Sequence, residues 1–365
     1  MIDRFPARHR VAGRVTQRGF TLIEVAIALL LGLLVIGAAS AIFISNKRIY
    51  DTTESLGRIQ ETSRVAFELM SRDIREAGGN PCSSGAVLVN QLTEGGNAWW
   101  TAFAAGIRGY GDAEAVPALA TGAGVGQRVA GTEAIEVHRS IGLDVRVTAH
   151  GLPEDPLSVT GVAGIADGDV LMVCNMDIAM IFQTTGAPAG NALQRSGPPS
   201  LNCADEFRFL VDCDAAPSMT SGYCFAPPAG PVPARCSRFG ASPAEVASPR
   251  SVRWYIGNNA RGGRSLYRSE VANESDSATP DQVLSTVEVA EGVEDLEVTY
   301  LLNGGAYTAP AAVADWTLVT SARIRLRVEA TEGALVARQI EGTDGERLGR
   351  WMTNVVNLRN REGTL

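Results

Sequence analysis

One acidic side chain, Glu24, lies inside an apolar run that extends from Phe20 to Ile44. A basic segment that ends in Gly19 precedes this run, which is long enough to cross the ~30 Å hydrocarbon layer of a membrane as a helix. A charged side chain in that layer costs about 2.5–3.5 kcal/mol even on lenient insertion scales. We therefore expect the Glu24 carboxylate to pair with an opposite charge, to take up a proton or to snorkel toward the membrane surface.

Six cysteines form the second group of residues whose side chains can do chemistry, and all of them follow the apolar run. An even number of cysteines in an exported segment favours disulfides over free thiols. Zinc is disfavoured because the three His lie far in sequence from the clustered cysteines and no CxxC pair occurs. The sequence leaves several pairings open, and we expect these three: Cys82–Cys174, Cys203–Cys213 and Cys224–Cys236.

Three short motifs resemble ligand sites, but each has a simpler interpretation. The glycine run 122–126 lacks the strand before it and the helix after it that a phosphate-binding loop requires, which favours a flexible loop. Asp167-Gly168-Asp169 lacks the spacing of an EF-hand, which favours a turn before a strand. Trp99-Trp100 is either a contact for a partner or, more in keeping with its surroundings, a buried anchor of its own loop.

No arrangement typical of catalysis is evident. His138 and His150 flank one expected β-hairpin and have no evident partner, and no Ser-His-Asp, Cys-His or paired-carboxylate pattern stands out. We therefore expect neither an enzyme nor a cofactor or metal site.

The segment 1–19 has the composition of a leader. Its excess of positive charge predicts that it stays in the cytoplasm and that everything after the apolar run is exported. An ordinary secretory signal, cut near Ala38-Ala39-Ser40-Ala41, is the alternative, but it explains neither Gly19 nor Glu24. The arginines of the leader are Arg4, Arg8, Arg10, Arg14 and Arg18.

The helix is expected to continue beyond the membrane-spanning half, 20–44, into an amphipathic half, 45–78. This second half contains no Pro, and Gly78-Gly79-Asn80-Pro81 provides a stop signal. Apolar residues recur at helical spacing on one face, at Ile49, Leu56, Ile59, Ala66, Leu69 and Ile74.

The remainder, 79–365, reads as a β-rich head with two inserts, at about 90–127 and 185–250. The clearest strand lies in 322–330, where Ile324, Leu326 and Val328 alternate with arginines, as in an antiparallel sheet with one face on a core. The sequence thus predicts an α+β fold in which a long N-terminal helix packs on an antiparallel sheet with a cysteine-rich insert. Other expected strands are 134–139, 144–148, 169–175, 179–184, 252–256, 265–269, 283–289, 294–302 and 352–358.

The residues Gly19-Phe20-Thr21-Leu22-Ile23-Glu24-Val25 resemble the class III signal of type IV prepilins and type II secretion pseudopilins. This resemblance implies cleavage by the prepilin peptidase between Gly19 and Phe20, followed by N-methylation of Phe20. It also implies a role for the acid: Glu24 of one subunit would neutralise the new amine of Phe20 on its neighbour, which removes two buried-charge penalties during assembly.

Seven short segments of the head carry a further resemblance: 169–174, 181–183, 252–256, 265–268, 289–300, 322–328 and 355–361. They are similar to the PilW family of minor pilins. The resemblance implies a complex with other minor pilins and the major pilin that primes type IV pilus assembly at or near the tip. The resemblance also implies that the chain is anchored in the inner membrane before assembly and that a tip adhesin is among its candidate partners. Through the pilus, the protein would support adhesion, twitching motility and DNA uptake. A type II secretion pseudopilin of the J kind and a pilus-borne adhesin that uses the 185–250 insert are the alternatives.

The net charge of −8 and the lack of a basic stripe argue against direct binding of nucleic acid.

Overall fold

The computed structural model divides the chain into two compact units, Met1–Glu54 and Ser55–Leu365. The expected leader up to Arg18 lies outside the described residues. These residues are 19–83, 85–93, 99–101, 103–188, 190–197, 201–208, 222–226, 236–239, 243–273, 282–303, 305–330 and 347–361.

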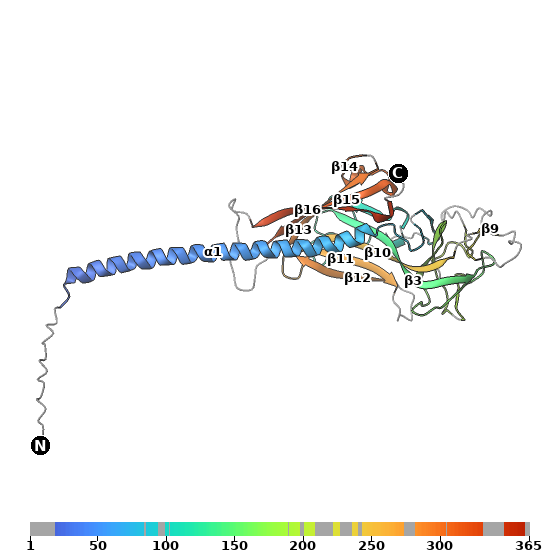
Figure 1. The fold of residues 1–365 in the computed structure, drawn as a ribbon, viewed down its shortest axis with the longest axis horizontal. Coiled ribbons are helices and arrows are strands. Elements are labelled where there is room, and N and C mark those ends of the chain that lie inside the picture. Colours follow the sequence, from blue (N-terminus) through green and yellow to red (C-terminus); the bar gives the residue numbers. More distant parts are fainter. Residues whose placement is uncertain are drawn as a thin grey trace, which may run out of the picture. The chain divides into compact units, whose positions relative to one another are not determined.

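The long helix α1 spans Leu22–Arg75 without interruption (Figure 1). It therefore begins after Phe20 and ends before Gly78, slightly inside both bounds expected from the sequence. The last turn tightens, because the Ala77 amide donates to the Ile74 carbonyl at 3.1 Å. Gly78 then adopts a positive φ of 68°, a conformation that glycine tolerates and that ends helices.

Within the second unit, the final part of α1 packs through one apolar stripe against the sheets. Ile59, Ala66 and Ile74 are buried there, as expected, and Met70 is buried with them. The sequence pattern also placed Leu69 and Ile49 on this face, but they are 40% and 62% exposed, so those two assignments were wrong. Each fully buried aliphatic side chain contributes about 1.5–3 kcal/mol, so this stripe is a major part of the core.

A ten-stranded sheet forms the larger layer of the head. Its main path runs β1-β6-β5-β10-β3-β4-β7, with β11 and β12 extending from β10 and with β2 paired to β3. Most pairs are antiparallel, whereas β1 and β6 are parallel. The strands are β1 Val87–Asn90, β2 Ile107–Tyr110, β3 Ala134–Ala149, β4 Leu157–Val159, β5 Val170–Cys174, β6 Ile178–Gln183, β7 Ala192–Leu193, β10 Glu245–Asn258, β11 Arg264–Asn273 and β12 Gln282–Glu291.

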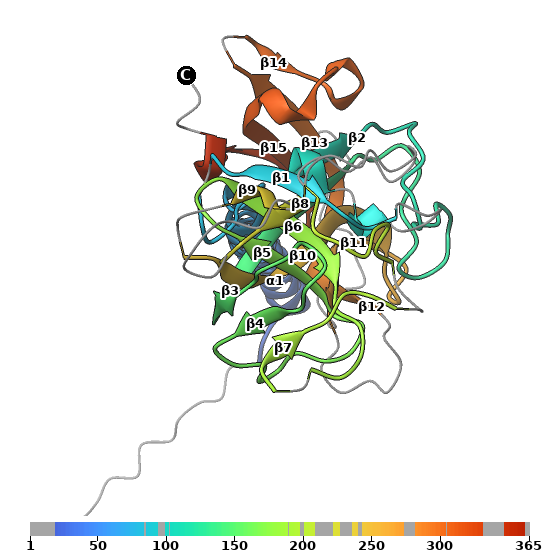
Figure 2. The ribbon, with the colours of Figure 1, turned by 90° about the vertical axis from the view of Figure 1, so that its right-hand side faces the viewer.

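A second, antiparallel sheet has the order β14-β13-β15-β16. Figure 2 shows its strands β13, β14 and β15 near the C-terminus of the chain. Its strands are β13 Val293–Leu302, β14 Tyr307–Thr308, β15 Val319–Glu329 and β16 Gly349–Asn357. The expected alternation in β15 is confirmed, since Ile324, Leu326 and Val328 are buried in the core that also receives α1. A small parallel pair joins β8 Gly222–Cys224 to β9 Cys236–Phe239. Short 3-10 helices are η1 Trp99–Thr101, η2 Phe103–Ala105, η3 Pro310–Ala312, η4 Trp316–Leu318 and η5 Arg359–Arg361.

The hairpin expected between 134–139 and 144–148 does not exist. Both segments belong to the single strand β3, which pairs along its length with β10. The residues that suggested a turn form an irregularity instead: the register with β10 shifts between Val246 and Ala247, and Asp144 adopts a positive φ of 56°. A bulge absorbs the extra residues without reversing the chain.

Parts of both inserts expected from the sequence pair with the main sheet. Strand β2 lies inside the expected insert 90–127 and pairs with the central strand β3. Strand β10 begins at Glu245, inside the expected insert 185–250, and its first residues pair with both β3 and β5. Both segments therefore supply strands to the main sheet.

Two disulfides have the pairing expected from the sequence. Cys82–Cys174 connects the segment after α1 to β5, with a Cα–Cα distance of 5.9 Å. Cys224–Cys236 connects β8 to β9, with a Cα–Cα distance of 5.6 Å. Cys203 is also disulfide-bonded, and its expected partner Cys213 lies outside the described residues.

Candidate processing and assembly site

The expected cleavage position lies just before α1, in residues without regular structure. Gly19 and Phe20 precede the helix, and the Phe20 side chain is 85% exposed. A peptide bond in an exposed, non-helical segment can be bound in an extended form by a peptidase, whereas a bond inside a helix must first unwind. The position is therefore suited to proteolysis, and cleavage itself stays a prediction.

Glu24 is part of a capping box at the start of α1. Its Oε2 atom accepts hydrogen bonds from the Thr21 amide and the Thr21 hydroxyl, both at 3.1 Å. In return, the Thr21 hydroxyl oxygen accepts a hydrogen bond from the Glu24 amide at 3.3 Å. Reciprocal bonds of this kind satisfy backbone donors that the first helical turn leaves without partners.

The capping box was missed in the sequence, although its signal was present. Thr21-Leu22-Ile23-Glu24 has the Thr-x-x-Glu spacing that is typical of a helix start. In the single chain the carboxylate of Glu24 thus contacts Thr21 rather than Phe20 of the same chain. The pairing between Glu24 and the Phe20 amine of another subunit stays a prediction.

The first part of α1 presents apolar side chains on all sides. Residues from Leu22 to Ile44 are almost all exposed in the single chain, and α1 is the helix in the described part that is long and apolar enough to cross a membrane. A helix that is apolar all round requires lipid or other apolar helices around it. This part of α1 therefore fits a membrane anchor that can also pack among the helices of a filament.

The end of α1 is fixed in the head by a buried carboxylate that the sequence analysis did not single out. Asp73 accepts hydrogen bonds from Trp254 Nε1 at 3.0 Å and from Arg268 Nε at 2.9 Å. A terminal nitrogen of Arg139 lies 3.5 Å from Oδ1, the other carboxylate oxygen of Asp73. A buried charge is stable only when it is paired in this way, so the cluster determines how the helix docks.

A buried polar chain runs through the middle of β3 and β10, contrary to the expectation that His138 has no partner. His138 Nε2 lies 3.0 Å from Glu136 Oε1, and His138 Nδ1 lies 2.9 Å from Ser251 Oγ. Arg253 donates to Glu136 Oε2 at 2.7 Å. Burial alone would raise the pKa of Glu136, but the hydrogen bonds and charges of His138 and Arg253 outweigh it and lower this pKa.

This Glu-His-Ser chain does not have the properties of a catalytic triad. All of its members are buried, and the Ser251 hydroxyl donates to the Trp100 carbonyl at 2.9 Å, so its proton is already engaged. Trp99 is also buried, with its ring 3.8 Å from the Arg253 guanidinium carbon. The interpretation as a buried loop anchor is confirmed for Trp99, whereas Trp100 is only partly buried, and the arrangement favours a structural role.

His150 is held in a second buried cluster, beside the Cys224–Cys236 disulfide. Its Nδ1 atom accepts a hydrogen bond from the Phe225 amide at 3.0 Å, and both disulfide sulfurs lie near the Gly151 carbonyl. Burial, followed by the positive charge of Arg195, lowers the pKa of His150 to about 4. His150 is therefore neutral in the folded protein at neutral pH.

The glycine run 122–126 is not a phosphate-binding loop. Its amides at Gly122, Gly124 and Gly126 donate to Arg128, Gln127 and Asn258. These amides are used within the protein and do not converge on an empty anion position.

The Asp167-Gly168-Asp169 segment forms a turn. Asp167 accepts from the Gly186 amide at 2.6 Å, and Asp169 accepts from the Ala166 amide at 2.9 Å. Among the described residues, no group of His, Cys, Asp and Glu side chains is arranged to hold a metal ion.

Comparison with known proteins identifies one family motif. Residues 14–40 match the prokaryotic N-terminal methylation motif, which covers the end of the basic segment, the capping box and the first turns of α1. No characterised protein and no solved structure matches the chain. The motif, the apolar anchor helix and the β-rich head with its disulfides together support the class of type IV pilins and pseudopilins.

Proposed function

We propose that this protein is a minor pilin that takes part in priming type IV pilus assembly and resides at or near the pilus tip. The observation that carries the proposal is the methylation motif, with Gly19 and Phe20 exposed before α1 and Glu24 fixed at its first turn. The similarity of the head segments to the PilW family supports the minor-pilin role. Adhesion, twitching motility and DNA uptake would then be supported indirectly, through the pilus.

The capping box suggests how Glu24 serves two interactions. Both hydrogen bonds from Thr21 go to Oε2, and among the described residues no group donates to Oε1. After cleavage, Phe20 carries a new positive amine four residues before Glu24. We infer that Oε2 keeps the helix start intact while Oε1 accepts the Phe20 amine of an adjacent subunit, so that assembly neutralises both charges in an apolar environment.

The proposed location follows from the same features. The basic leader would remain cytoplasmic, α1 would anchor the precursor in the inner membrane, and the head would lie in the periplasm, where disulfides such as Cys82–Cys174 form. The mature subunit would then enter the pilus with other minor pilins and the major pilin, after processing by the prepilin peptidase.

Mass spectrometry of sheared pili from a strain without the retraction motor tests the proposal. We expect a mature chain in the fibre that begins at N-methylated Phe20. A native chain that retains Met1, or that begins beyond Ala41, would contradict it. Glu24→Val should keep the chain in the membrane but exclude it from pili, and the variant Glu54→Val, altered at an acid outside the motif, provides the matched control.

The same motif also fits a type II secretion pseudopilin of the J kind. The two functions differ in where the mature chain appears: in sheared type IV pili, or only in the secretion apparatus. Deletion of residues 209–221, within the 185–250 insert, tests the third function, a pilus-borne adhesin. Loss of surface binding with piliation intact would support it.

A further inference from the structure

Among the described residues, two long strands end the sheets of the head, and each has one edge without a partner strand. β12, of 10 residues, ends the larger sheet beyond β11, and β16, of 9 residues, ends the smaller sheet beyond β15. The other terminal strands, β1, β2, β7 and β14, have at most 4 residues. Natural proteins usually shorten, bend or charge an exposed edge, often with Pro or Lys. Neither β12 nor β16 contains Pro or Lys, so both edges are open to a further strand.

The backbone of β16 presents alternate residues to its free edge. The Leu358 amide donates to the Thr320 carbonyl, so Leu358 and every second residue before it face β15. The intervening residues, which include Thr353 and Val355, therefore face away from β15. The Val355 amide agrees with this, because it donates to the side-chain oxygen of Asn354 at 2.9 Å. The Thr353 amide thus points to the free edge and has no acceptor in the described part of the chain.

The same alternation holds for β12. The Gly292 amide donates to the Arg264 carbonyl, so Arg264 and every second residue after it in β11 face β12. Arg268 is one of these residues, and its partner Val287 therefore faces β11. The residues of β12 that face the free edge are Leu284, Thr286 and Glu288.

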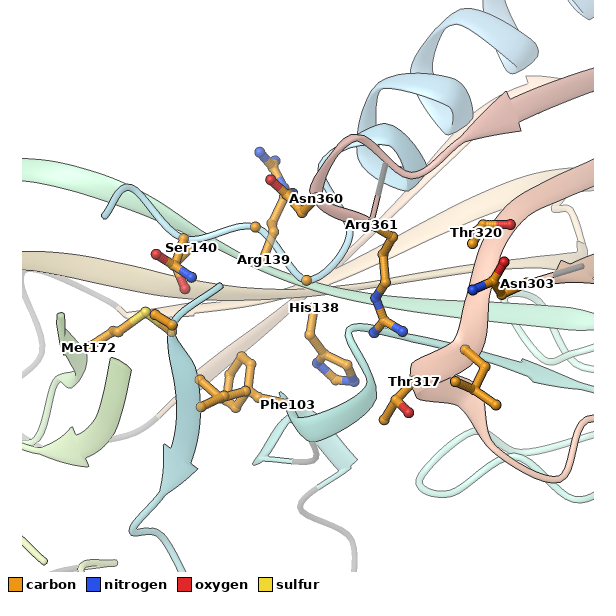
Figure 3. A pocket seen from close by; sticks show the side chains of 16 residues that line it. Phe103, His138, Arg139, Ser140, Met172, Asn303, Thr317, Thr320, Asn360 and Arg361 are labelled. Carbon is orange, nitrogen blue, oxygen red and sulfur yellow. The ribbon is translucent and has the colours of Figure 1, made fainter. Parts of the chain in front are cut away.

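β16 runs in the same direction as the final part of α1. The Asn354 side chain donates to the Ser71 hydroxyl at 3.0 Å. Asn360, which lies later in the chain on η5, donates to the carbonyls of Glu76 and Ala77 at the end of the helix (Figure 3). Later residues of this segment therefore contact later residues of α1.

β12 runs in the opposite direction to α1. Val287 lies opposite Arg268, whose side chain binds Asp73. Leu284, earlier in β12, lies at the level of Gly78, through the pairing of β11 with β10 and of β10 with β3. Copies anchored in one membrane have parallel α1 helices, so β16 of one copy and β12 of another meet as antiparallel strands. Two β16 edges would meet antiparallel only if one of the helices were reversed.

The side chains of the two edges match in this arrangement. β16 and β12 flank the final part of α1 in Figure 1, so a neighbour that is turned about an axis parallel to α1 joins with both helices on one face of the combined sheet. Residues that face away from α1 then pair with one another. Thr353 opposite Thr286 places Val355 opposite Leu284, and these two side chains are 50% and 48% exposed in the single chain. Thr–Thr and aliphatic pairs across strands stabilise a sheet.

The charges of the two strands do not oppose this contact. β16 contains Arg350 and no acid, whereas β12 contains Glu288 and Glu291 and no base. Arg261 of the same chain binds both carboxylates of β12, so they require no partner from the second copy. Like charges across an interface are a common means of excluding a partner, and they are absent here.

We propose that β16 of one copy pairs with β12 of a second copy anchored in the same membrane, so that one sheet continues from head to head. The contact joins two different edges, so further copies can extend the row. A single pair of strands is marginal in water, and the contact therefore depends on the high effective concentration that a shared membrane provides. The inference goes beyond the proposed function, and it holds whether the chain serves a pilus or a secretion system.

Disulfide cross-linking of the full chain in liposomes tests the pairing. One copy carries Thr353→Cys, and a second copy with a different tag carries Thr286→Cys. Opposite residues at a hydrogen-bonded position have Cα atoms about 5.5 Å apart, a distance that a disulfide spans. Under mild oxidation we expect a link between the two copies. This link should be lost when Ala113→Cys, an exposed position outside both edges, replaces Thr286→Cys.

The same experiment distinguishes the other possible occupants of the β16 edge. If two Thr353→Cys copies link to each other as strongly as to Thr286→Cys, two β16 edges meet and the proposal is wrong. In native membranes, a Thr353→Cys link that joins a different protein in place of a second copy would also overturn it. So would the absence of any link above the Ala113→Cys background.

Amide hydrogen exchange of the wild type needs no variant. The amides of Trp351 and Thr353 face the free edge of β16, so they should exchange more slowly in densely loaded liposomes than in nanodiscs that hold one copy. The Asn354 amide faces β15 and should be protected in both preparations. Equal exchange of the Trp351 and Thr353 amides in the two preparations would contradict the proposed pairing.

Discussion

His150 should make the stability of the head depend on pH. The side chain is 1% exposed, and its Nδ1 atom accepts the Phe225 amide proton, so protonation of Nδ1 would break that hydrogen bond. Phe207 and Phe225 surround the ring, with centroid distances of 5.2 Å and 5.9 Å. Arg195, itself buried, opposes a second positive charge nearby. The folded protein therefore disfavours the protonated imidazole.

The sign and size follow from the two states of the chain. The pKa of His150 is lowered from 6.5 to about 4 on folding. As pH falls from about 6.5 to about 4, the unfolded chain takes up a proton that the folded chain does not, so the free energy of unfolding decreases. The difference between the two pKa values corresponds to a loss on the order of 3 kcal/mol.

Glu133 acts in the opposite direction in nearly the same pH range. Burial raises the pKa of this carboxyl from 4.5 to about 7, although the Val298 amide, which donates to it at 2.6 Å, opposes the shift. The stability that its protonated form contributes is present below about pH 4.5 and is lost as pH rises through about 7. The wild-type curve should therefore be flatter than either group alone would make it.

Urea unfolding of the full chain in detergent, followed by tryptophan fluorescence from about pH 4 to about pH 7.5, measures both effects. His150→Asn keeps an acceptor for the Phe225 amide but does not titrate. Its stability penalty relative to the wild type should shrink by about 3 kcal/mol between the upper and lower pH. Glu133→Gln should reveal the full acid-induced loss. A His150→Asn penalty that is the same at both ends of the range would refute the reasoning.

Three further predictions concern the anchoring of α1 and its start. Asp73→Asn should lower the free energy of unfolding by about 3 kcal/mol or more, because Arg268 and Arg139 lose a buried partner; urea unfolding checks this, with Asp51→Asn, an acid of the other unit, as the control. Replacing Cys82 and Cys174 together by Ser should lower the free energy of unfolding by about 4 kcal/mol, as expected for a disulfide that closes a long loop. The part of the reductant-induced shift in the thermal unfolding temperature that depends on this disulfide should then disappear. Thr21→Ala should weaken the helix start by about 1 kcal/mol, seen as faster amide exchange at Glu24, whose amide donates to the Thr21 hydroxyl, whereas Thr21→Ser should not; unchanged exchange in Thr21→Ala would show that the capping box does not stabilise the helix start.

Local patterns in the sequence predicted the elements that a single face or a short motif determines. The alternation in 322–330 predicted β15 because one face of this strand contacts the core and the other holds arginines. The Gly-rich segment after α1 predicted the end of the helix for a similar reason, since the backbone conformation of Gly78 determines it. Both signals depend on neighbours in sequence.

The partners of buried polar residues were not predictable in this way. Asp73 accepts hydrogen bonds from Trp254 and Arg268, which lie 181 and 195 positions later in the sequence. His138 contacts Ser251, which lies 113 positions later. A polar residue on an otherwise apolar stripe indicates that a partner is needed, but the identity of the partner depends on the sheet register. The turn signal near Asp144 failed likewise, because β10 extends past it and converts the expected turn into a bulge.

Glu24, in the first turn of α1, shows both what the sequence can predict and what it cannot. The apolar run made the need for a partner of Glu24 evident, but that need alone did not distinguish an interaction within the chain from one between chains. The capping box supplies the first through Oε2, and a neutral Gln at this position would retain it in part. Only the second interaction requires a full negative charge. Glu24→Gln should therefore start the helix normally yet assemble poorly, and normal assembly of this variant would remove the reason for a charge in the membrane.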